Sequence, residues 1–466
     1  MTDRASPSPD RLESLDYHEA LAAIAARGRF GIRLGLGRTR ALLRELGDPQ
    51  LAVRGALVAG TNGKGSVLAL AGSALRAAGL RVGETPKPHL VTYRERIVID
   101  GRPIGAEDFT RHVRAVMAVS DKVARRHGDP TEFELLTAVV FRHFAEAGLD
   151  VALVEVGLGG RLDATHAWDG GVAVVTNVDL DHTDRLGPTI AAIAREKAAI
   201  IERGDLAVTG ATGEALEIIG RRARRMAVPL TVVEPATVLG LDRDGLEVAL
   251  PGLGTIRIGL RGRHQAANVA VADATLDALA EAGIATVDPE ARRRGYATAV
   301  WPGRLELLDL GEGRGVVLDG AHNPAGAAAL AQALDDLRPH FVPGPLTLVV
   351  ASMADKDVDG VVAAMAGSDA LRGAAVIATT VDAPRALPAA ELADRWRRVT
   401  GPATVTAVGE PLRALEAALA RPGTTVVAGS LYLVGAIRAH LVDDPDLRDP
   451  DPSDSEPEPD PGARAK

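Results

Sequence analysis

The sequence predicts an α/β protein made of two units, each built on a mostly parallel β-sheet with helices on both faces. Short runs rich in Val, Leu and Ile alternate with longer stretches rich in Ala, Leu and Arg, as strands alternate with crossover helices. The chain has 466 residues, too many for one ordinary domain, and its hydrophobic content of 46% can fill more than one core. The segment from Pro229 to Leu260 alternates with turn signals and predicts a small antiparallel patch, and a helix is expected from His264 to Ala282. The predicted buried strands are Gly55–Ala59, Val151–Val156, Val172–Asn177, Val316–Asp319, Leu346–Ala351, Val376–Thr379 and Thr425–Ala428.

Changes of pattern along the chain predict the boundaries of the units. Residues 1–15 lack an apolar signal core and are expected to form a disordered leader. The first unit is expected to span residues 16–300, and the second, smaller unit residues 301–442. Residues 443–466 hold nine acidic residues, three basic residues and six prolines, so this acidic tail is expected to stay disordered.

Composition excludes several classes of protein. The absence of cysteine excludes disulfides, thiolate metal sites and cysteine nucleophiles, and it fits a cytoplasmic protein. The sequence has no uninterrupted run of about 18 apolar residues, so no membrane span is expected. No basic stripe with interleaved aromatic residues supports a nucleic-acid partner. We therefore expect a monomer that acts on small molecules.

The strongest local signal is a glycine-rich turn between a buried strand and a helix rich in Ala and Leu. The residues of this turn are Gly60, Thr61, Asn62, Gly63, Lys64, Gly65 and Ser66. Glycines let backbone N–H groups turn inward around phosphates, and the helix N-terminus adds a favourable dipole. Lys64 would reach the β- and γ-phosphates of ATP, and the Ser66 hydroxyl would bind Mg²⁺. The spacing is a variant of the P-loop, because Gly65 separates the Lys from the Ser. An ordinary glycine turn is the alternative, but it would not combine strand, glycines, Lys, Ser and helix.

Two further strand ends carry polar residues suited to a metal site. Glu155 lies in an otherwise apolar strand, where a carboxylate is costly unless it is paired or bound to metal. A structural salt bridge is the alternative for Glu155. The next strand leads to Asp181 and His182, and imidazole is a reasonable ligand for Mg²⁺ or Mn²⁺, although Mg²⁺ more often takes oxygen.

Lys197 interrupts the apolar face of a predicted helix. Its neighbours on that face are Ile190, Ile193, Ala194 and Ile201. The side chain could reach solvent along its aliphatic stem. Alternatively, burial would lower its pKa and leave a population of neutral amine, which can react with carbon dioxide to form an anionic carbamate.

Taken together, the motifs resemble the Mur-ligase superfamily, and most closely the folylpolyglutamate/dihydrofolate synthase family. The resemblance extends from about Gly31 to Leu441. The motifs that carry it are GLGRTRALLRELGDPQ, GTNGKGS, PHL with RERI, TEFELLTAVVF, EVGLGGRLDAT, LDHTDRLG, REKAAII, GRHQAANVAVA, WPGRLE, LDGAHNPAG, DKD and AGSLYLVG. The resemblance implies a P-loop ATPase domain of the Mur-ligase type with a parallel sheet, and a smaller Rossmann-like C-terminal α/β domain.

The resemblance also implies an activity and its residues. The enzyme would use ATP and two Mg²⁺ ions to add L-glutamate to dihydropteroate, to a reduced folate, or to both, through an acyl phosphate. The magnesium ligands would be Ser66, Glu155, His182 and a carbamoylated Lys197, and the catalytic residues would be Lys64, Lys197 and His322. Positions that match residues facing the nucleotide from across a cleft are Asn268, Arg304 and Asp319, and positions near the incoming amino acid are His322, Ser430 and Tyr432. Acceptor-side positions are Lys87, Pro88, His89, Asp163 and Thr165.

Three departures from the family pattern leave the acceptor open. Lys87 stands where family members commonly have Ser, His166 where they have Asn, and Ala199 where they have Gly. Lys87 and His166 are expected on the acceptor side of the site. A cationic Lys87 could hold an extra carboxylate of a substrate, or it could be a harmless surface change.

Three functions remain compatible with the sequence. The first is the folate enzyme, and the second is a paralogue that applies the same chemistry to another carboxylate. The third is a non-catalytic P-loop binding protein, against which Arg304, Asp319 and His322 argue, because a nucleotide sensor does not need them.

Overall fold

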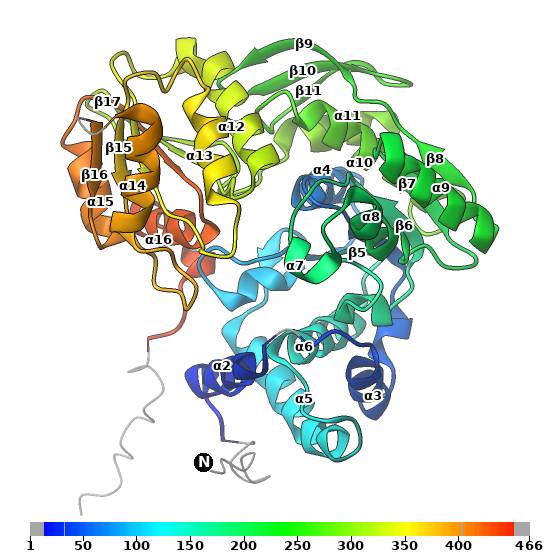
Figure 1. The fold of residues 1–466 in the computed structure, drawn as a ribbon. Coiled ribbons are helices and arrows are strands. Elements are labelled where there is room, and N and C mark those ends of the chain that lie inside the picture. The colour runs from blue at the N-terminus through cyan, green and yellow to red at the C-terminus, as the bar shows by residue number, and fades with distance from the viewer. Residues whose placement is uncertain (1–13, 32, 402–403, 452–466) are drawn as a thin grey trace, which may run out of the picture.

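The computed structural model describes residues 14–31, 33–401 and 404–451 (Figure 1). The chain forms two α/β units with largely parallel sheets, as the sequence predicts. Residues 1–13 and 452–466, which hold most of the predicted leader and much of the predicted tail, lie outside the described residues. Within the described ranges, every helix is too short or too polar to cross a bilayer.

The first unit is built on an eight-stranded sheet in the order β4-β3-β2-β5-β1-β6-β7-β8. Its strands are β1 (Gly55–Ala59), β2 (Val82–Thr85), β3 (Val98–Ile99), β4 (Arg102–Pro103), β5 (Val151–Glu155), β6 (Gly171–Val175), β7 (Leu206–Thr209) and β8 (Leu230–Val232). All of the pairs are parallel except β2–β3 and β3–β4. β1 and β5 are buried at every position because helices cover both faces of the sheet. The carboxyl ends of β1, β5 and β6 therefore lie side by side.

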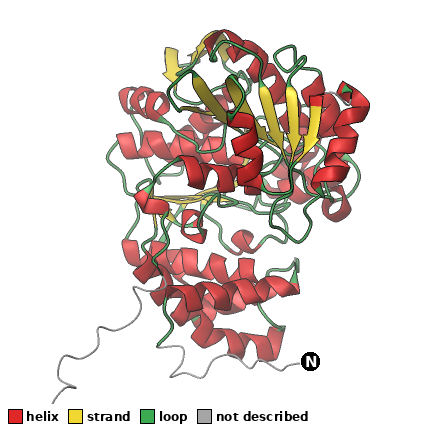
Figure 2. Cartoon of the chain, turned by 90° about the vertical axis from the view of Figure 1, so that its left-hand side faces the viewer, coloured by secondary structure: helices red, strands yellow, loops and turns green. Residues whose placement is uncertain are grey.

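Helices bury the two faces of this sheet. One face packs against α2 (Tyr17–Ala25), α3 (Gly37–Glu45), α5 (Ala106–His127), α6 (Glu132–Ala147), α8 (Ile190–Ala198) and α9 (Gly213–Met226). The other packs against α4 (Lys64–Ala77), α10 (Gln265–Glu281) and α11 (Pro289–Thr298). The start of α6 is set by its local sequence, because Thr131 and Glu134 form a capping box there. In Figure 2 the helices nearest the N-terminus form a layer below the strands.

A three-stranded antiparallel sheet follows, made of β9 (Thr237–Asp242), β10 (Gly245–Leu250) and β11 (Gly254–Ile258). The sequence predicts this patch from Pro229 onward, but Leu230–Val232 instead forms β8, which pairs with β7 in parallel. A strand of three residues is too short for its pattern to show which sheet it joins.

The second unit is built on a six-stranded sheet in the order β12-β13-β17-β14-β15-β16. Its strands are β12 (Glu306–Asp309), β13 (Arg314–Leu318), β14 (Thr347–Val350), β15 (Ala375–Ala378), β16 (Val405–Ala407) and β17 (Gly423–Ala428). Its helices are α12 (Pro324–Leu337), α13 (Val358–Ala366), α14 (Ala389–Thr400), α15 (Pro411–Leu419) and α16 (Leu431–Leu441). Only the edge strand β12 runs antiparallel to its neighbour. A hydrophobic cluster covers each face of the sheet.

Both ends of the described chain make contacts with the rest of the protein. Leu15, in the predicted leader, is buried, and its carbonyl accepts a hydrogen bond from Arg114 at 3.0 Å. After α16 the chain makes a 3₁₀ turn at Pro445–Leu447, and Asp449 then pairs with Arg94 at 3.2 Å. Residues 443–451 therefore make defined contacts, and the disorder of the acidic tail stays a prediction. The composition of a segment shows whether it can form an apolar core. It does not show whether a carboxylate such as that of Asp449 finds hydrogen-bond donors elsewhere in the fold.

Candidate active site

A cleft of about 780 Å³ lies between the two units. The first unit contributes the turn after β1 and residues at the carboxyl ends of β5 and β6. The second contributes the loop after β13 and the start of α16. The carboxyl ends of parallel strands are the usual place for ligands in such folds.

The glycine-rich turn lies between β1 and α4, as the sequence predicts. Gly63 caps α4 with a φ of 81°, and a Cβ at this position would lie 2.2 Å from Oδ1 of Asn268. Only glycine meets both the left-handed backbone and this close approach. Lys64 Nζ donates to the carbonyl oxygens of Gly60 and Thr61, both at 3.1 Å. Lys64 therefore lies within the turn.

The chain after β6 holds the phosphate loop in shape. The Asn62 N–H donates to Oδ1 of Asn177 at 2.9 Å, and Oγ1 of Thr176 donates to the Asn62 carbonyl at 2.6 Å. Oγ1 of Thr61 donates to the Asp179 carbonyl at 3.1 Å. These bonds fix the loop from the neighbouring strand end.

Glu155 is the last residue of β5 and is 4% exposed. Its Oε1 lies 3.8 Å from Lys64 Nζ, and its Oε2 accepts the Lys87 N–H at 3.0 Å. Burial raises the pKa of this carboxyl, which Lys64 opposes. Glu155 is thus a buried carboxylate next to the phosphate loop.

Lys87 forms part of the cleft wall. Its Nζ donates to the Glu155 carbonyl at 2.7 Å and lies 4.4 Å from the centroid of the Phe133 ring. Burial lowers the pKa of Lys87 to about 8. Lys87 therefore lines the cleft, and its effect on acceptor choice stays a prediction.

Asp181 and His182 follow β6 and line the cleft. His182 caps the short helix α7 (Thr183–Leu186) with a φ of 50°, and its Nε2 lies 3.9 Å from Oδ2 of Asp181. Burial, together with Lys356, lowers the pKa of His182. A neutral imidazole has a lone pair that can bind metal.

Lys197 is buried in α8, with 5% of its surface exposed. Its Nζ donates to the Gly60 carbonyl at 2.8 Å. Burial, reinforced by Lys64, lowers the pKa of Lys197 to about 7. The alternative in which this side chain reaches solvent is wrong, and the neutral amine is abundant near pH 7.

The donor set fits magnesium held together with a nucleotide. Ser66, Glu155, His182 and Lys197 all line the cleft. Within the described ranges, no three His, Asp or Glu side chains form a metal cage. Mg²⁺ in nucleotide sites is normally held by one or two carboxylates together with phosphates and water. A buried Glu155 beside the phosphate loop suits that arrangement.

The loop after β13 brings the second unit to the cleft. Asp319 accepts the N–H of Leu305 on Oδ2 at 2.9 Å and the N–H of Ala321 on Oδ1 at 2.8 Å, so it fixes two loops. Arg304 lines the cleft, and its Nη1 donates to the Gly303 carbonyl at 3.2 Å.

His322 lies in the same loop and lines the cleft. Its Nδ1 is 2.8 Å from the Gly320 carbonyl, which can only accept, so Nδ1 carries the proton and Nε2 the lone pair. Burial, reinforced by Lys356, lowers the pKa of His322 to about 4.

Asn268, on α10, is buried and donates to Oε1 of Gln265 at 2.8 Å.

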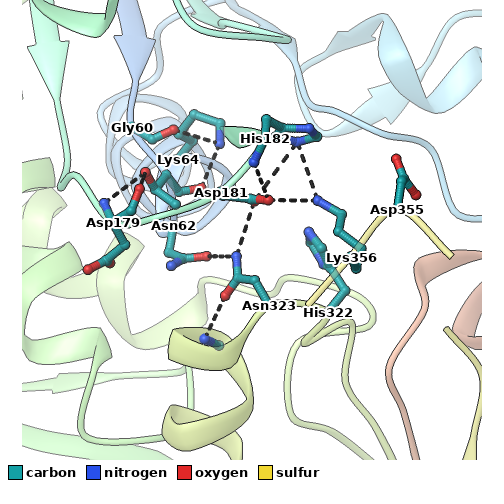
Figure 3. Close-up of polar contacts among 12 residues, drawn as sticks. Gly60, Asn62, Lys64, Asp179, Asp181, His182, His322, Asn323, Asp355 and Lys356 are labelled. Carbon is teal, nitrogen blue, oxygen red and sulfur yellow. Dashed lines mark hydrogen bonds and ion pairs between the residues drawn. The ribbon is translucent and has the colours of Figure 1, made fainter. Parts of the chain in front are cut away.

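Two residues with no role in the sequence analysis join the units across the cleft. Nδ2 of Asn323 lies 3.1 Å from Oδ1 of Asn62 and 3.2 Å from Oδ2 of Asp181 (Figure 3). Nζ of Lys356 lies 2.8 Å from Oδ1 of Asp181. Both residues belong to motifs that carry the family resemblance, LDGAHNPAG and DKD. A single sequence does not say which polar residue of a loop faces the other unit.

The predicted acceptor-side residues divide into two groups. Lys87 and Pro88, joined by a cis peptide bond, line the cleft. His89 instead accepts from Arg96 Nε on Nδ1 at 2.8 Å, and burial together with Arg96 lowers its pKa to about 3.

Asp163 and Thr165 are joined by two hydrogen bonds. Oδ1 of Asp163 accepts both the N–H of Thr165 at 3.0 Å and its hydroxyl at 2.6 Å, and Oδ2 accepts the N–H of Leu158 at 2.8 Å. Both side chains are buried. Asp163 therefore shapes the loop after β5, which lines the cleft.

His166 was expected on the acceptor side, and this expectation is wrong. Its Nε2 lies 3.3 Å from Oε1 of Glu202, and its Nδ1 lies 3.2 Å from the Arg161 carbonyl, away from the cleft lining. His166 lies in the 3₁₀ turn Ala164–Ala167, where successive side chains point about 120° apart. Its neighbour Thr165 therefore faces a different side.

The start of α16 and the segment before β12 complete the cleft. Ser430, the N-cap of α16, is 2% exposed, and its Oγ has no hydrogen-bond partner among the described residues. Tyr432 is 56% exposed and lines the cleft. Trp301 lies against the phosphate loop, because a Cβ on Gly65 would be 2.4 Å from its ring.

Comparison with known proteins agrees with this geometry. Residues 58–276 match the Mur ligase middle domain, and residues 303–431 match the Mur ligase glutamate ligase domain. The chain is 34% identical to the dihydrofolate synthase/folylpolyglutamate synthase of Bacillus subtilis over 440 residues, which cover 91% of this chain and 99% of that protein.

Solved structures resemble most of the chain. The folylpolyglutamate synthase of Mycobacterium tuberculosis, complexed with ADP and AMPPCP, superposes with a TM-score of 0.82 at 34% identity and covers 92% of this chain and 100% of that one. The Escherichia coli FolC structure in complex with DHPP and ADP gives a TM-score of 0.76 at 29% identity, over 90% of this chain and 97% of that one. With both Mur ligase domains and full-length relatives of one kind, this chain belongs to the folylpolyglutamate synthase/dihydrofolate synthase family of ATP-dependent carbon–nitrogen ligases.

Proposed function

We propose that this chain uses ATP to join L-glutamate to the carboxylate of dihydropteroate, of a reduced folate, or of both, releasing ADP and phosphate. One observation carries the proposal. The phosphate loop and the loop after β13 touch directly, through Asn62 and Asn323 at 3.1 Å. A nucleotide site on one unit and an amine site on the other would therefore share one cleft. The relatives named above support pterin acceptors and glutamate as substrates.

In the first step, a carboxylate oxygen of the acceptor bonds to the γ-phosphorus of ATP while the bond from that phosphorus to ADP breaks. The product is an acyl phosphate. Lys64, within the phosphate loop, neutralises charge on the transferring group. Arg304, from the second unit, adds a second positive charge from across the cleft.

In the second step, the glutamate amine attacks the acyl carbon and phosphate leaves. The amine must lose a proton before or during the attack. His322 is suited to accept it, because Nδ1 is occupied by the Gly320 carbonyl and burial keeps Nε2 unprotonated. The buried hydroxyl of Ser430, at the N-terminus of α16, suits a carboxylate of the amino acid.

Magnesium would be held by Ser66, Glu155, His182 and the carbamate of Lys197, together with the phosphates. Bound Mg²⁺ would neutralise charge on the γ-phosphate. The lowered pKa of Lys197 supports carbamate formation, in which the neutral amine bonds to carbon dioxide and releases a proton. Carbon-13 NMR with labelled bicarbonate would test it, with a carbamate resonance expected from the wild type and not from Lys197→Met.

A paralogue with a different acceptor is the second candidate, and Lys87 favours it. Its ammonium lies in the cleft wall where family members commonly have Ser. His166 no longer supports this alternative, because it faces Glu202. A Lys87→Ser variant that gains activity with pterins would identify Lys87 as the cause of a changed specificity.

Phosphate release tests the proposal directly. Purified protein would receive ATP, Mg²⁺ and L-glutamate with dihydropteroate, with tetrahydrofolate or with no acceptor, and products would be checked by mass. Release that requires a pterin, with a product heavier by one glutamyl unit, is the expected result. Binding of ATP without turnover on any pterin would contradict it. A monomeric state and a cytoplasmic location stay predictions, and light scattering tests the first.

A further inference from the structure

The cleft wall on the acceptor side includes residues 87–96, which end in the 3₁₀ helix Tyr93–Arg96 and which we term the acceptor loop. It contributes Lys87, Pro88 and Arg96 to the cleft lining. Hydrogen bonds to carboxylates, rather than pairing with a β-strand, fix the backbone of this loop. Glu155 binds the first residue of the loop, and Glu95 accepts the N–H groups of Leu90, Val91 and Thr92 at 2.6–3.0 Å.

The third carboxylate comes from the far end of the chain. Oδ1 of Asp449 accepts the hydroxyls of Thr92 and Tyr17, each at 2.7 Å, and pairs with Nε of Arg94 at 3.2 Å. Nη2 of Arg94 also donates to the Arg448 carbonyl at 2.6 Å. Burial and Asp449 raise the pKa of Tyr17 to about 12, so its hydroxyl stays a donor. A single carboxylate oxygen thus joins the acceptor loop, α2 and the C-terminal segment.

The acceptor loop also meets α16 on another side. A Cβ on Gly435 would lie 1.9 Å from the Leu90 carbonyl oxygen, so glycine is required for this contact. Arg438 anchors the last turn of α16 by pairing with Glu306 at 3.1 Å and Asp444 at 4.0 Å. In Figure 1 the chain after α16 runs from the second unit towards α2. The loop is therefore bracketed by α16 and by the segment that follows it.

We propose that residues 443–450 form a strap that positions the acceptor loop, with Asp449 as its positioning residue. The proposal rests on the proposed function, since it takes the cleft wall at Lys87 to meet the acceptor. Ser430 is the N-cap of α16, and the helix presents Tyr432 to the cleft. One element therefore faces the predicted amino-acid site and also contacts the acceptor loop. The strap sets acceptor affinity and leaves ATP affinity unchanged, because the phosphate loop has separate anchors after β6.

The test compares Asp449→Ala with the matched control Asp446→Ala, which removes the same charge from an exposed side chain of the same segment. For Asp449→Ala we expect KM for the acceptor to rise about tenfold, because Thr92, Tyr17 and Arg94 all lose their contact with Oδ1. The Kd for ATP and the melting temperature should change little. Asp449→Asn keeps Oδ1 as an acceptor and should restore part of the effect. Hydrogen exchange of peptides covering residues 87–96 should quicken in Asp449→Ala only.

The exchange measurement needs no substrate, so it separates this proposal from the proposed function. Faster exchange in the loop of a protein that turns over no pterin would support the strap and overturn the assigned acceptor. Unchanged exchange and unchanged acceptor KM in Asp449→Ala would overturn the strap. A drop in melting temperature with equal losses for ATP and acceptor would also overturn it, because it would assign Asp449 a purely structural role.

Discussion

Replacing Lys197 by methionine should make the protein more stable at neutral pH. The side chain is 5% exposed, and its pKa of about 7 lies below the ordinary value of 10.5. Between pH 7 and pH 10.5 the unfolded state binds more protons at Lys197 than the folded state does. The destabilisation caused by burying this amine is therefore largest at low pH and disappears as pH rises through 10.5. Linkage gives a cost of about 4 kcal/mol at pH 7 and about 1 kcal/mol at pH 10.

Methionine has a similar length and carries no charge, but it loses the 2.8 Å bond to the Gly60 carbonyl. That bond contributes about 1 kcal/mol. The net gain of Lys197→Met is therefore about 3 kcal/mol at pH 7 and near zero at pH 10. Urea unfolding followed by circular dichroism, in buffers free of carbon dioxide, would measure both values.

Lys122→Met is the matched control, since this lysine is 52% exposed and pairs with Glu45 at the surface. Its effect should stay below about 1 kcal/mol and should not depend on pH between 7 and 10. A Lys197→Met protein less stable than wild type at pH 7, or equally stabilised at pH 10, would refute the reasoning. Carbamate formation should be lost in the same variant, so stability and activity should move in opposite directions.

Two other predictions concern the cleft. Gly63→Ala should lower ATP affinity at least about tenfold with the fold retained, because a Cβ would strain a φ of 81° and meet Asn268 at 2.2 Å. Calorimetric titration of ATP tests this, and unchanged affinity would contradict the loop geometry. Lys356→Met should remove the 2.8 Å pair with Asp181 and raise the pKa of His322, which Lys356 helps to lower. The acidic limb of the kcat/KM profile should then move to higher pH, and a shift to lower pH would exclude His322 as the proton acceptor.

The parts of the site that sequence predicts well are those defined by neighbours along the chain. The phosphate loop was predictable because strand, glycines, Lys64 and helix follow one another directly. Helical phase placed Lys197 on the apolar face of α8 but left open whether its amine reaches solvent, which only the packing around the helix decides. His166 was misplaced because a 3₁₀ turn changes the direction of successive side chains.

The contacts that join distant segments could not be predicted. Lys356 and Asp181 are 175 positions apart, and Thr92 and Asp449 are 357 apart. Neither pair has a local pattern, because each depends on how whole units pack. Strands of two residues, such as β3 and β4, are likewise too short to show a period.

The position of Trp301 gives the protein an optical reporter. The chain has three tryptophans, and Trp168 and Trp396 are enclosed in the cores at 1% and 3% exposure. Trp301 alone lines the cleft, against Gly65 of the phosphate loop. Its indole fluorescence should change when a nucleotide occupies the loop, while the other two emit a constant background. ATP titrations of every variant above can therefore be read from intrinsic emission, without a label.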